Sequence, residues 1–173
     1  MLLDRGLAAS TVADVAEAAG VAKGTVYLYF ESKDALLAGL RARYLTRFAE
    51  AVEGPVGPGR ASVLTRLQRF VDGLFDFSVR NKALHHLLFH EAGFSEDDAF
   101  AGARTLLEGL LAEGRAEGAF DVRDPAVSAS FLLHGLHGVL VEVLHRGPEG
   151  RRQAVATARH LVRNTVAPMK LDS

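Results

Sequence analysis

One stretch, Thr11 to Leu37 (TVADVAEAAGVAKGTVYLYFESKDALL), constrains the fold of this chain more than any other. Apolar residues recur at helical spacing between Val12 and Ala19, which predicts a short helix with one apolar face. Thr11 can cap this helix, because Asp14 stands where the acid of a capping box belongs. Gly20 then ends it, since glycine enters the left-handed backbone conformation without steric cost.

A second short helix is predicted from about Lys23 to Phe30, directly after this turn. Val21, the apolar residue that follows the break, is expected to fill the angle between the two helices. Ser32 is placed to cap a third helix, which is expected to run from Lys33 to Val52. This arrangement is typical of a helix-turn-helix, whose second helix presents side chains to base edges in the major groove of DNA.

The stretch resembles the DNA-binding motif of the TetR family of bacterial transcriptional regulators, named after the tetracycline repressor. The resemblance is carried by TVADVAEAAGV at 11–21, KGTVYLYF at 23–30 and SKDALL at 32–37. It implies an all-α protein with two parts. Residues 1–47 would form the helix-turn-helix DNA-binding domain with the start of a connecting helix, and residues 48–173 a larger helical domain for effector binding and dimerisation.

The function that the resemblance implies is that of a regulator, here expected to be a repressor, that binds double-stranded operator DNA as a homodimer. A small hydrophobic effector would release it from the operator. The residues assigned to DNA are Thr11, Lys23, Gly24, Thr25, Tyr27, Tyr29 and Lys33. Thr25 and Tyr27 are expected near base edges, while Lys23 and Gly24 start the recognition helix and the other three reach phosphates.

The chain departs from the family pattern at its beginning. A complete first helix precedes the motif in the family, and only its final turn, Leu2–Gly6, is matched here. A start codon assigned too late, a truncated chain and a loss of DNA binding all remain open. The last of these leads to an alternative function, a helical effector-binding dimer that no longer binds DNA.

The rest of the chain keeps a helical pattern after a Gly- and Pro-rich breaker at Glu53–Gly59. The expected helices are Ala61–Arg80, Lys82–Ala92, Asp97–Glu117, Pro125–Arg146 and Glu149–Val166. The last two are predicted to form the dimer surface, because small residues allow two helices to approach closely. The residues assigned to it are Gly135, Gly138, Val155, Ala158, Leu161 and Val162. The resemblance implies a four-helix bundle between protomers, and a monomeric helical bundle is the alternative.

An effector pocket is expected to be mostly apolar, with a few polar groups. The residues assigned to it are Phe70, Leu74, Phe77, His86, Phe89, His90, Leu107, Phe131 and His134. His86 and His90 share a helix face, and His134 forms a second such pair with His137. These spacings leave a metal-responsive regulator open as an alternative, but no metal site and no cofactor are predicted.

Composition narrows the function further. The chain has 173 residues, 20 basic and 21 acidic side chains and no cysteine. A net charge near zero means that DNA binding must come from a local patch, which a dimer would double. No signal peptide and no membrane-length apolar run are recognised, so a cytoplasmic protein without membrane contact is expected. No catalytic motif occurs, so an enzyme is not expected.

Overall fold

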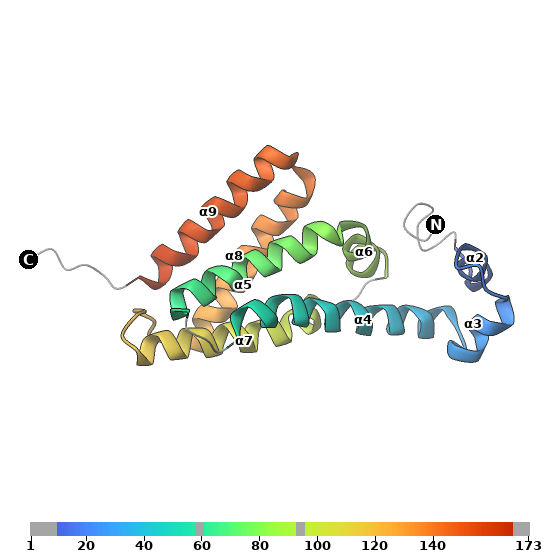
Figure 1. Ribbon diagram of the computed structural model, residues 1–173, viewed down its shortest axis with the longest axis horizontal. Coiled ribbons are helices and arrows are strands. Elements are labelled where there is room, and N and C mark those ends of the chain that lie inside the picture. Colours follow the sequence, from blue (N-terminus) through green and yellow to red (C-terminus); the bar gives the residue numbers. More distant parts are fainter. Residues whose placement is uncertain (1–9, 58–60, 93–95, 168–173) are drawn as a thin grey trace, which may run out of the picture. The chain divides into compact units, whose positions relative to one another are not determined.

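The protein is built from helices joined by short connections (Figure 1). The computed structural model describes residues 10–57, 61–92 and 96–167, is 83% helical, and has no strand among these residues. The elements are α2 (Val12–Ala18), α3 (Lys23–Tyr29), α4 (Lys33–Glu53), the 3-10 turn η1 (Gly54–Val56), α5 (Val63–Arg80), α6 (Lys82–His86), the π-helical segment η2 (Leu87–Glu91), α7 (Glu96–Ala116), α8 (Pro125–His145) and α9 (Pro148–Val166).

The predicted all-α fold is confirmed, and each expected helix is present with bounds that differ by only a few residues. One difference concerns the predicted helix Lys82–Ala92. It changes after His86 from α-helical to π-helical hydrogen bonding, which extends to Glu91. Apolar periodicity cannot predict such a local widening of a helix, because a segment of five residues is too short for the spacing of its apolar residues to distinguish the two forms. The first-helix residues Leu2–Gly6 lie outside the described residues.

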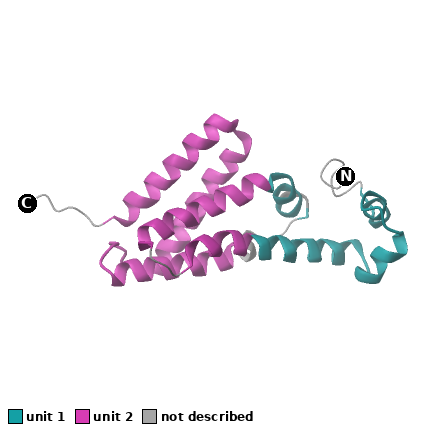
Figure 2. Cartoon of the chain, in the orientation of Figure 1, with its two compact units in different colours: residues 1–47, 81–96 teal, residues 48–80, 97–173 magenta. Residues whose placement is uncertain are grey.

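Two compact units divide the chain (Figure 2). Unit 1 comprises Met1–Arg47 and Asn81–Glu96, and unit 2 comprises Phe48–Arg80 and Asp97–Ser173. Helix α4 belongs to both, since it starts in unit 1 and ends in unit 2. The functional division into 1–47 and 48–173 stays a prediction; α6 and η2, which it assigned to the second part, belong to unit 1.

Unit 1 has an aromatic and polar core where α4 meets α6 and η2. The Tyr44 hydroxyl and Nδ1 of His85 are 2.9 Å apart in a buried hydrogen bond. The Phe89 ring packs edge-on against Tyr44, with centroids 5.8 Å apart, and lies 4.7 Å from the His85 ring centroid. This one hydrogen bond therefore connects the two segments of unit 1 that are distant in sequence.

Replacing Tyr44 by Phe is expected to lower the free energy of unfolding by about 1 kcal/mol, because a buried hydrogen bond to His85 is lost while the ring remains. Tyr29→Phe is the matched control, since the Tyr29 side chain is 78% exposed. Urea denaturation of both variants measures the difference. Equal stabilities of the two variants would show that the Tyr44–His85 bond contributes nothing.

Unit 2 is organised around α5, which packs against α8 and α9. Phe70, Val71 and Leu74 of α5 are at most 1% exposed. At the α4 end, the Phe48 ring makes edge-on contacts with Phe77 and Phe100, at centroid distances of 5.5 and 6.1 Å. These contacts are the apolar core that the helical periodicity predicted.

Two ion pairs link helices of unit 2. Arg66 of α5 pairs with Glu113 of α7, and its Nε donates to the carbonyl oxygen of Val56 at 2.8 Å. Arg159 of α9 pairs with Asp72 of α5. Each pair therefore links two helices of unit 2 that are distant in sequence.

Helix α8 is the most apolar helix that the structure describes. By length and composition it could cross a membrane, with a mean hydropathy of 1.6, which differs from the expectation that no segment would pass this test. Buried residues on it, among them Ala129, Leu140 and Val143, face the protein, since α8 packs on α5 and α9. A core helix meets the same length and composition test, so this finding is weak evidence for a membrane span.

Candidate DNA-binding surface

Helix α2 begins with the predicted capping box. The Asp14 amide donates to the Thr11 hydroxyl at 3.2 Å, and the Asp14 carboxylate accepts from the Thr11 amide at 2.7 Å. The Thr11 hydroxyl also donates to this carboxylate, at 2.7 Å. Both donors of Thr11 are therefore engaged within α2, and a contact from Thr11 to a phosphate requires that the box open.

The turn between α2 and α3 is closed by the backbone. Gly20 has φ +68°, the left-handed conformation predicted for it, and the Val21 amide donates to the Ala16 carbonyl oxygen at 3.0 Å. The Val21 side chain is 43% exposed, so the expectation that it fills the angle between the helices was wrong. Because backbone hydrogen bonds already fix the turn, an apolar plug is not required; Val12 and Ala16 bury the inner face of α2 instead.

Helix α3 presents most of its side chains to solvent. None of its residues is buried, and Tyr27, Leu28 and Tyr29 are 44%, 84% and 78% exposed. Val26 is half-buried on the inner side. The assigned residues Lys23, Gly24 and Thr25 are exposed as well.

A contact with α4 holds the end of α3 in place. The Phe30 ring lies directly over Gly39 of α4, where an added Cβ would be only 2.8 Å from Cε1 of the ring. Ser32 begins α4 as predicted, with its hydroxyl accepting from the Ala35 amide at 3.1 Å. Lys33 is half-buried in the first turn of α4. The outer side of α3 thus remains free while its inner side is anchored.

The residues at the start of α3 combine a cation with an aromatic face. The Lys23 ammonium lies 5.7 Å from the centroid of the Tyr27 ring, a cation–π contact. The N-cap residue of α3, Ala22, makes no side-chain hydrogen bond to the first turn. Leu28 was not assigned to DNA from the sequence, although its place between the two tyrosines of the motif puts it on the exposed helix.

The residues assigned to an effector pocket are spread over both units. His86 and Phe89 belong to unit 1, where His86 is exposed and Phe89 is buried, and the His90 side chain lies outside the described residues. Four others are buried in unit 2: Phe70, Leu74, Phe77 and Leu107. Phe131 is 70% exposed, and His134 is exposed with Nδ1 2.7 Å from the Ser130 carbonyl oxygen.

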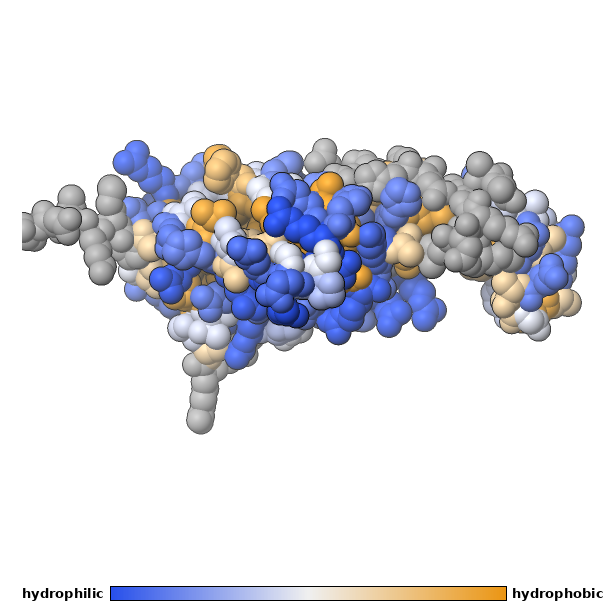
Figure 3. Space-filling view, turned by 90° about the horizontal axis from the view of Figure 1, so that it is seen from above, coloured by the Kyte–Doolittle hydropathy of each residue, from blue (hydrophilic) through white to orange (hydrophobic). Residues whose placement is uncertain are grey.

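All the residues assigned to a dimer surface except Gly138 line one of two grooves of unit 2. Gly135, Ala158, Leu161 and Val162 line a groove of about 260 Å³ between α8 and α9. Phe131 is part of the same groove. Val155 lines a different groove between α5 and α9, and Gly138 is exposed. In the space-filling view, hydrophobic residues appear on the surface among hydrophilic ones (Figure 3).

Among the described side chains, which do not include that of His90, no group of three His, Cys, Asp or Glu could hold a metal ion. His137 packs against the Phe100 ring, with centroids 5.2 Å apart. The His137 ring therefore takes part in the packing of unit 2.

Comparison with known proteins agrees with the family resemblance of the sequence motif. Residues 1–40 match the family model described as bacterial regulatory proteins, tetR family. A probable HTH-type transcriptional regulator, ArpR of Pseudomonas putida, is 28% identical over 155 residues, which cover 78% of this chain and 71% of that protein. The HTH-type transcriptional repressor KstR2 of Mycobacterium tuberculosis is 37% identical over 90 residues, or 50% of this chain and 40% of that protein.

The fold is shared over nearly the whole chain with solved structures. One of them is a SmeT–triclosan complex. Its alignment with this protein covers 99% of this chain and 88% of the SmeT chain, with a TM-score of 0.77 at 19% identity. At that identity the likeness concerns the fold. The names of the relatives are those of transcriptional regulators and agree with the expectation that the chain is not an enzyme.

Proposed function

Because the chain belongs to the tetR family of bacterial regulatory proteins, we propose that it represses transcription by binding an operator through α3. The observation that supports this proposal is that α3 is anchored on one side and exposed on the other. The helix is anchored on one side by Phe30 against Gly39 and by the half-buried Val26, while its other side chains are exposed. A short helix held in this way can enter the major groove without exposing any of the core.

Thr25 and Tyr27 would contact base edges from the exposed side of α3. Lys23 would neutralise a phosphate, and Tyr29 and Lys33 would reach phosphates farther along the backbone. We add Leu28 to this set, because an exposed apolar side chain beside Tyr27 can contact a thymine methyl group. Thr11 contributes chiefly as the cap of α2, since both its donors are bonded to Asp14.

A homodimer formed through α8 and α9 would supply the second recognition helix. Phe131 and Leu161 support it, because they are 70% and 54% exposed and line one apolar groove. Gly135 also lines it, and a Cβ added there would meet no atom within 4 Å, so another helix can approach closely. We therefore move Phe131 from the effector pocket to this face.

Release by a small hydrophobic effector is the second half of the proposal. The complex of SmeT, which shares this fold, contains triclosan, a small molecule. An effector releases DNA only in proportion to its preference for a conformer with wrongly spaced recognition helices. Helix α4, which belongs to both units, would transmit the change.

The test is a fluorescence-anisotropy titration of the 173-residue chain with DNA from upstream of its own gene, at low and physiological salt. Binding that resists scrambled competitor DNA and weakens with salt is the expected result. Equal affinity for upstream and scrambled DNA would overturn the proposal.

Replacing Lys23 by Ala is expected to weaken binding to operator and to scrambled DNA by a similar factor. It should also reduce the slope of log K against log salt by about 2 for a dimer, since one phosphate contact is lost per protomer. Lys82→Ala, which removes an equal charge from α6, is the control and should leave the slope unchanged. A slope that does not change in Lys23→Ala would contradict the phosphate role.

A further inference from the structure

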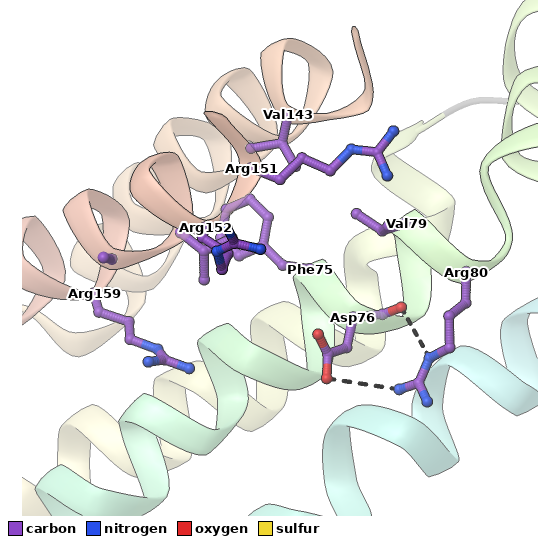
Figure 4. A pocket seen from close by; sticks show the side chains of 10 residues that line it. Phe75, Asp76, Val79, Arg80, Val143, Arg151, Arg152 and Arg159 are labelled. Carbon is purple, nitrogen blue, oxygen red and sulfur yellow. Dashed lines mark hydrogen bonds and ion pairs between the residues drawn. The ribbon is translucent and has the colours of Figure 1, made fainter. Parts of the chain in front are cut away.

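A groove of about 570 Å³ lies in unit 2 between α5, the end of α8 and the first half of α9 (Figure 4). Its floor is apolar. Phe75 and Val143 are buried at 1% and 0% exposure, and Val79 and Val155 are half-buried beside them. The volume falls within the range of small-molecule sites, which is about 300–1,000 Å³. The groove is separate from the apolar groove around Phe131, because the two have no lining residue in common.

The rim of this groove carries four arginines and one aspartate among its lining residues: Arg80, Arg151, Arg152, Arg159 and Asp76. Three of the arginines have carboxylate partners. Arg80 pairs with Asp76 at 3.7 Å, Arg152 with Glu149 and Arg159 with Asp72. These pairs offset the charges of three of the four arginines. Among the described residues, the Arg151 guanidinium has no carboxylate partner.

Arg151 differs from the other three. Within the described part of the chain, its guanidinium makes one hydrogen bond, from Nε to the Arg146 carbonyl oxygen at 2.8 Å. That bond holds the side chain in place and leaves the two terminal nitrogens for another acceptor. In Figure 4, Arg151 points away from α9 toward the α5 side, with no dashed line to another lining residue. A fixed guanidinium with free terminal nitrogens matches the geometry of a carboxylate.

We propose that this arginine groove binds an organic anion with an apolar body, of which aryl and alkyl carboxylates are the simplest. The hydrocarbon part covers Phe75, Val79 and Val143, and the carboxylate accepts two hydrogen bonds from Arg151. A bare inorganic anion gains nothing from the apolar floor, and a neutral hydrocarbon leaves the Arg151 nitrogens unpaired. The groove and α3 share no residue, so binding in the groove can be measured without DNA.

The test compares 4-phenylbutyrate with its neutral analogue 4-phenylbutan-1-ol and with inorganic phosphate, each titrated into the 173-residue chain. Methyl NMR shifts of Val79 and Val143 report occupancy of the groove without DNA. A ligand of this size is expected to bind with a Kd on the order of a millimolar. Phenylbutyrate is expected to bind about tenfold more tightly than the alcohol, because the alcohol lacks the charged acceptor for Arg151.

Single substitutions inside and outside the groove test where the carboxylate of the ligand binds. Arg151→Ala should remove the roughly tenfold preference for the carboxylate, and Arg151→Lys, which keeps the charge without the planar fork, should restore part of it. Arg163→Ala removes an equal charge from α9 outside the groove and should have no effect. Val79→Trp should block both ligands by filling the floor.

Three results would overturn the proposal: equal affinity for phenylbutyrate and the alcohol, equal weakening by Arg163→Ala and Arg151→Ala, or binding that persists in Val79→Trp. Phosphate that moves the same methyl signals at the same concentrations would also overturn it, because the apolar body would then play no part. A failure of operator binding has no bearing on these readouts, since none of them contains DNA.

Discussion

Phe131→Glu is expected to convert the protein to a monomer and to weaken specific operator binding strongly. Phe131 is 70% exposed on α8 and lines the apolar groove that also contains Leu161 of α9. In a two-fold symmetric dimer each substitution acts twice, so two carboxylates would be buried without partners. Leaving one charged group unpaired in an interface costs several kcal/mol, and the two copies of this cost together oppose association.

The effect on DNA follows from the loss of the second recognition helix. A dimer binds two half-sites, and the second contact gains from an effective local concentration that a monomer lacks. We therefore expect operator affinity to fall by a factor on the order of 10²–10⁴. Sedimentation gives the oligomeric state and anisotropy gives the affinity, at the same protein concentrations.

Val141→Glu is the control for this variant. Val141 is a 40% exposed apolar residue on the same helix, but it does not line the groove around Phe131. It should remain dimeric and bind operator like the unmodified chain. A dimeric Phe131→Glu protein, or one that binds operator unchanged, would place the subunit contact elsewhere.

Gly73→Val is expected to lower the free energy of unfolding by about 3 kcal/mol. At Gly73, α5 lies directly against the backbone of α4. A Cβ at Gly73 would lie 2.8 Å from the Ala51 carbonyl oxygen and 3.3 Å from the Val52 Cα atom. Both neighbours are backbone atoms of a helix, so neither can rotate away, and the two helices would have to separate.

The same substitution at Gly109 of α7 separates packing from helix propensity. Gly109 is an exposed helical glycine, and a Cβ added there would meet no atom within 4 Å. Gly109→Val should change stability by no more than about 0.5 kcal/mol, because valine and glycine differ little in helix propensity. Chemical denaturation of both variants gives the comparison. Equal losses at the two positions would mean that the close approach of α4 and α5 has no energetic consequence.

The sequence was sufficient for features whose physical cause lies within a turn or two of chain. The Thr11–Asp14 capping box, the left-handed Gly20 and the Ser32 cap are local, and the structure has all three. The helix bounds could be predicted from the sequence for the same reason, because caps, prolines and apolar periodicity act over a few residues. The motif in residues 11–37 was dense enough to indicate, before any tertiary contact was known, the family whose model matches residues 1–40.

Tertiary structure decided which apolar residues are covered, and by what. Helical spacing gives Val21 and Phe131 an apolar role, but both are exposed, at 43% and 70%. It also gives Phe75 an ordinary packing role, and sequence reasoning assigned Val155 to a dimer surface, although both line a groove with Arg151, a residue far from Phe75 in sequence. Periodicity reports the phase of a helix, whereas exposure depends on which other helices stand against it and at what distance. That information lies in contacts between distant segments, so only the folded chain contains it.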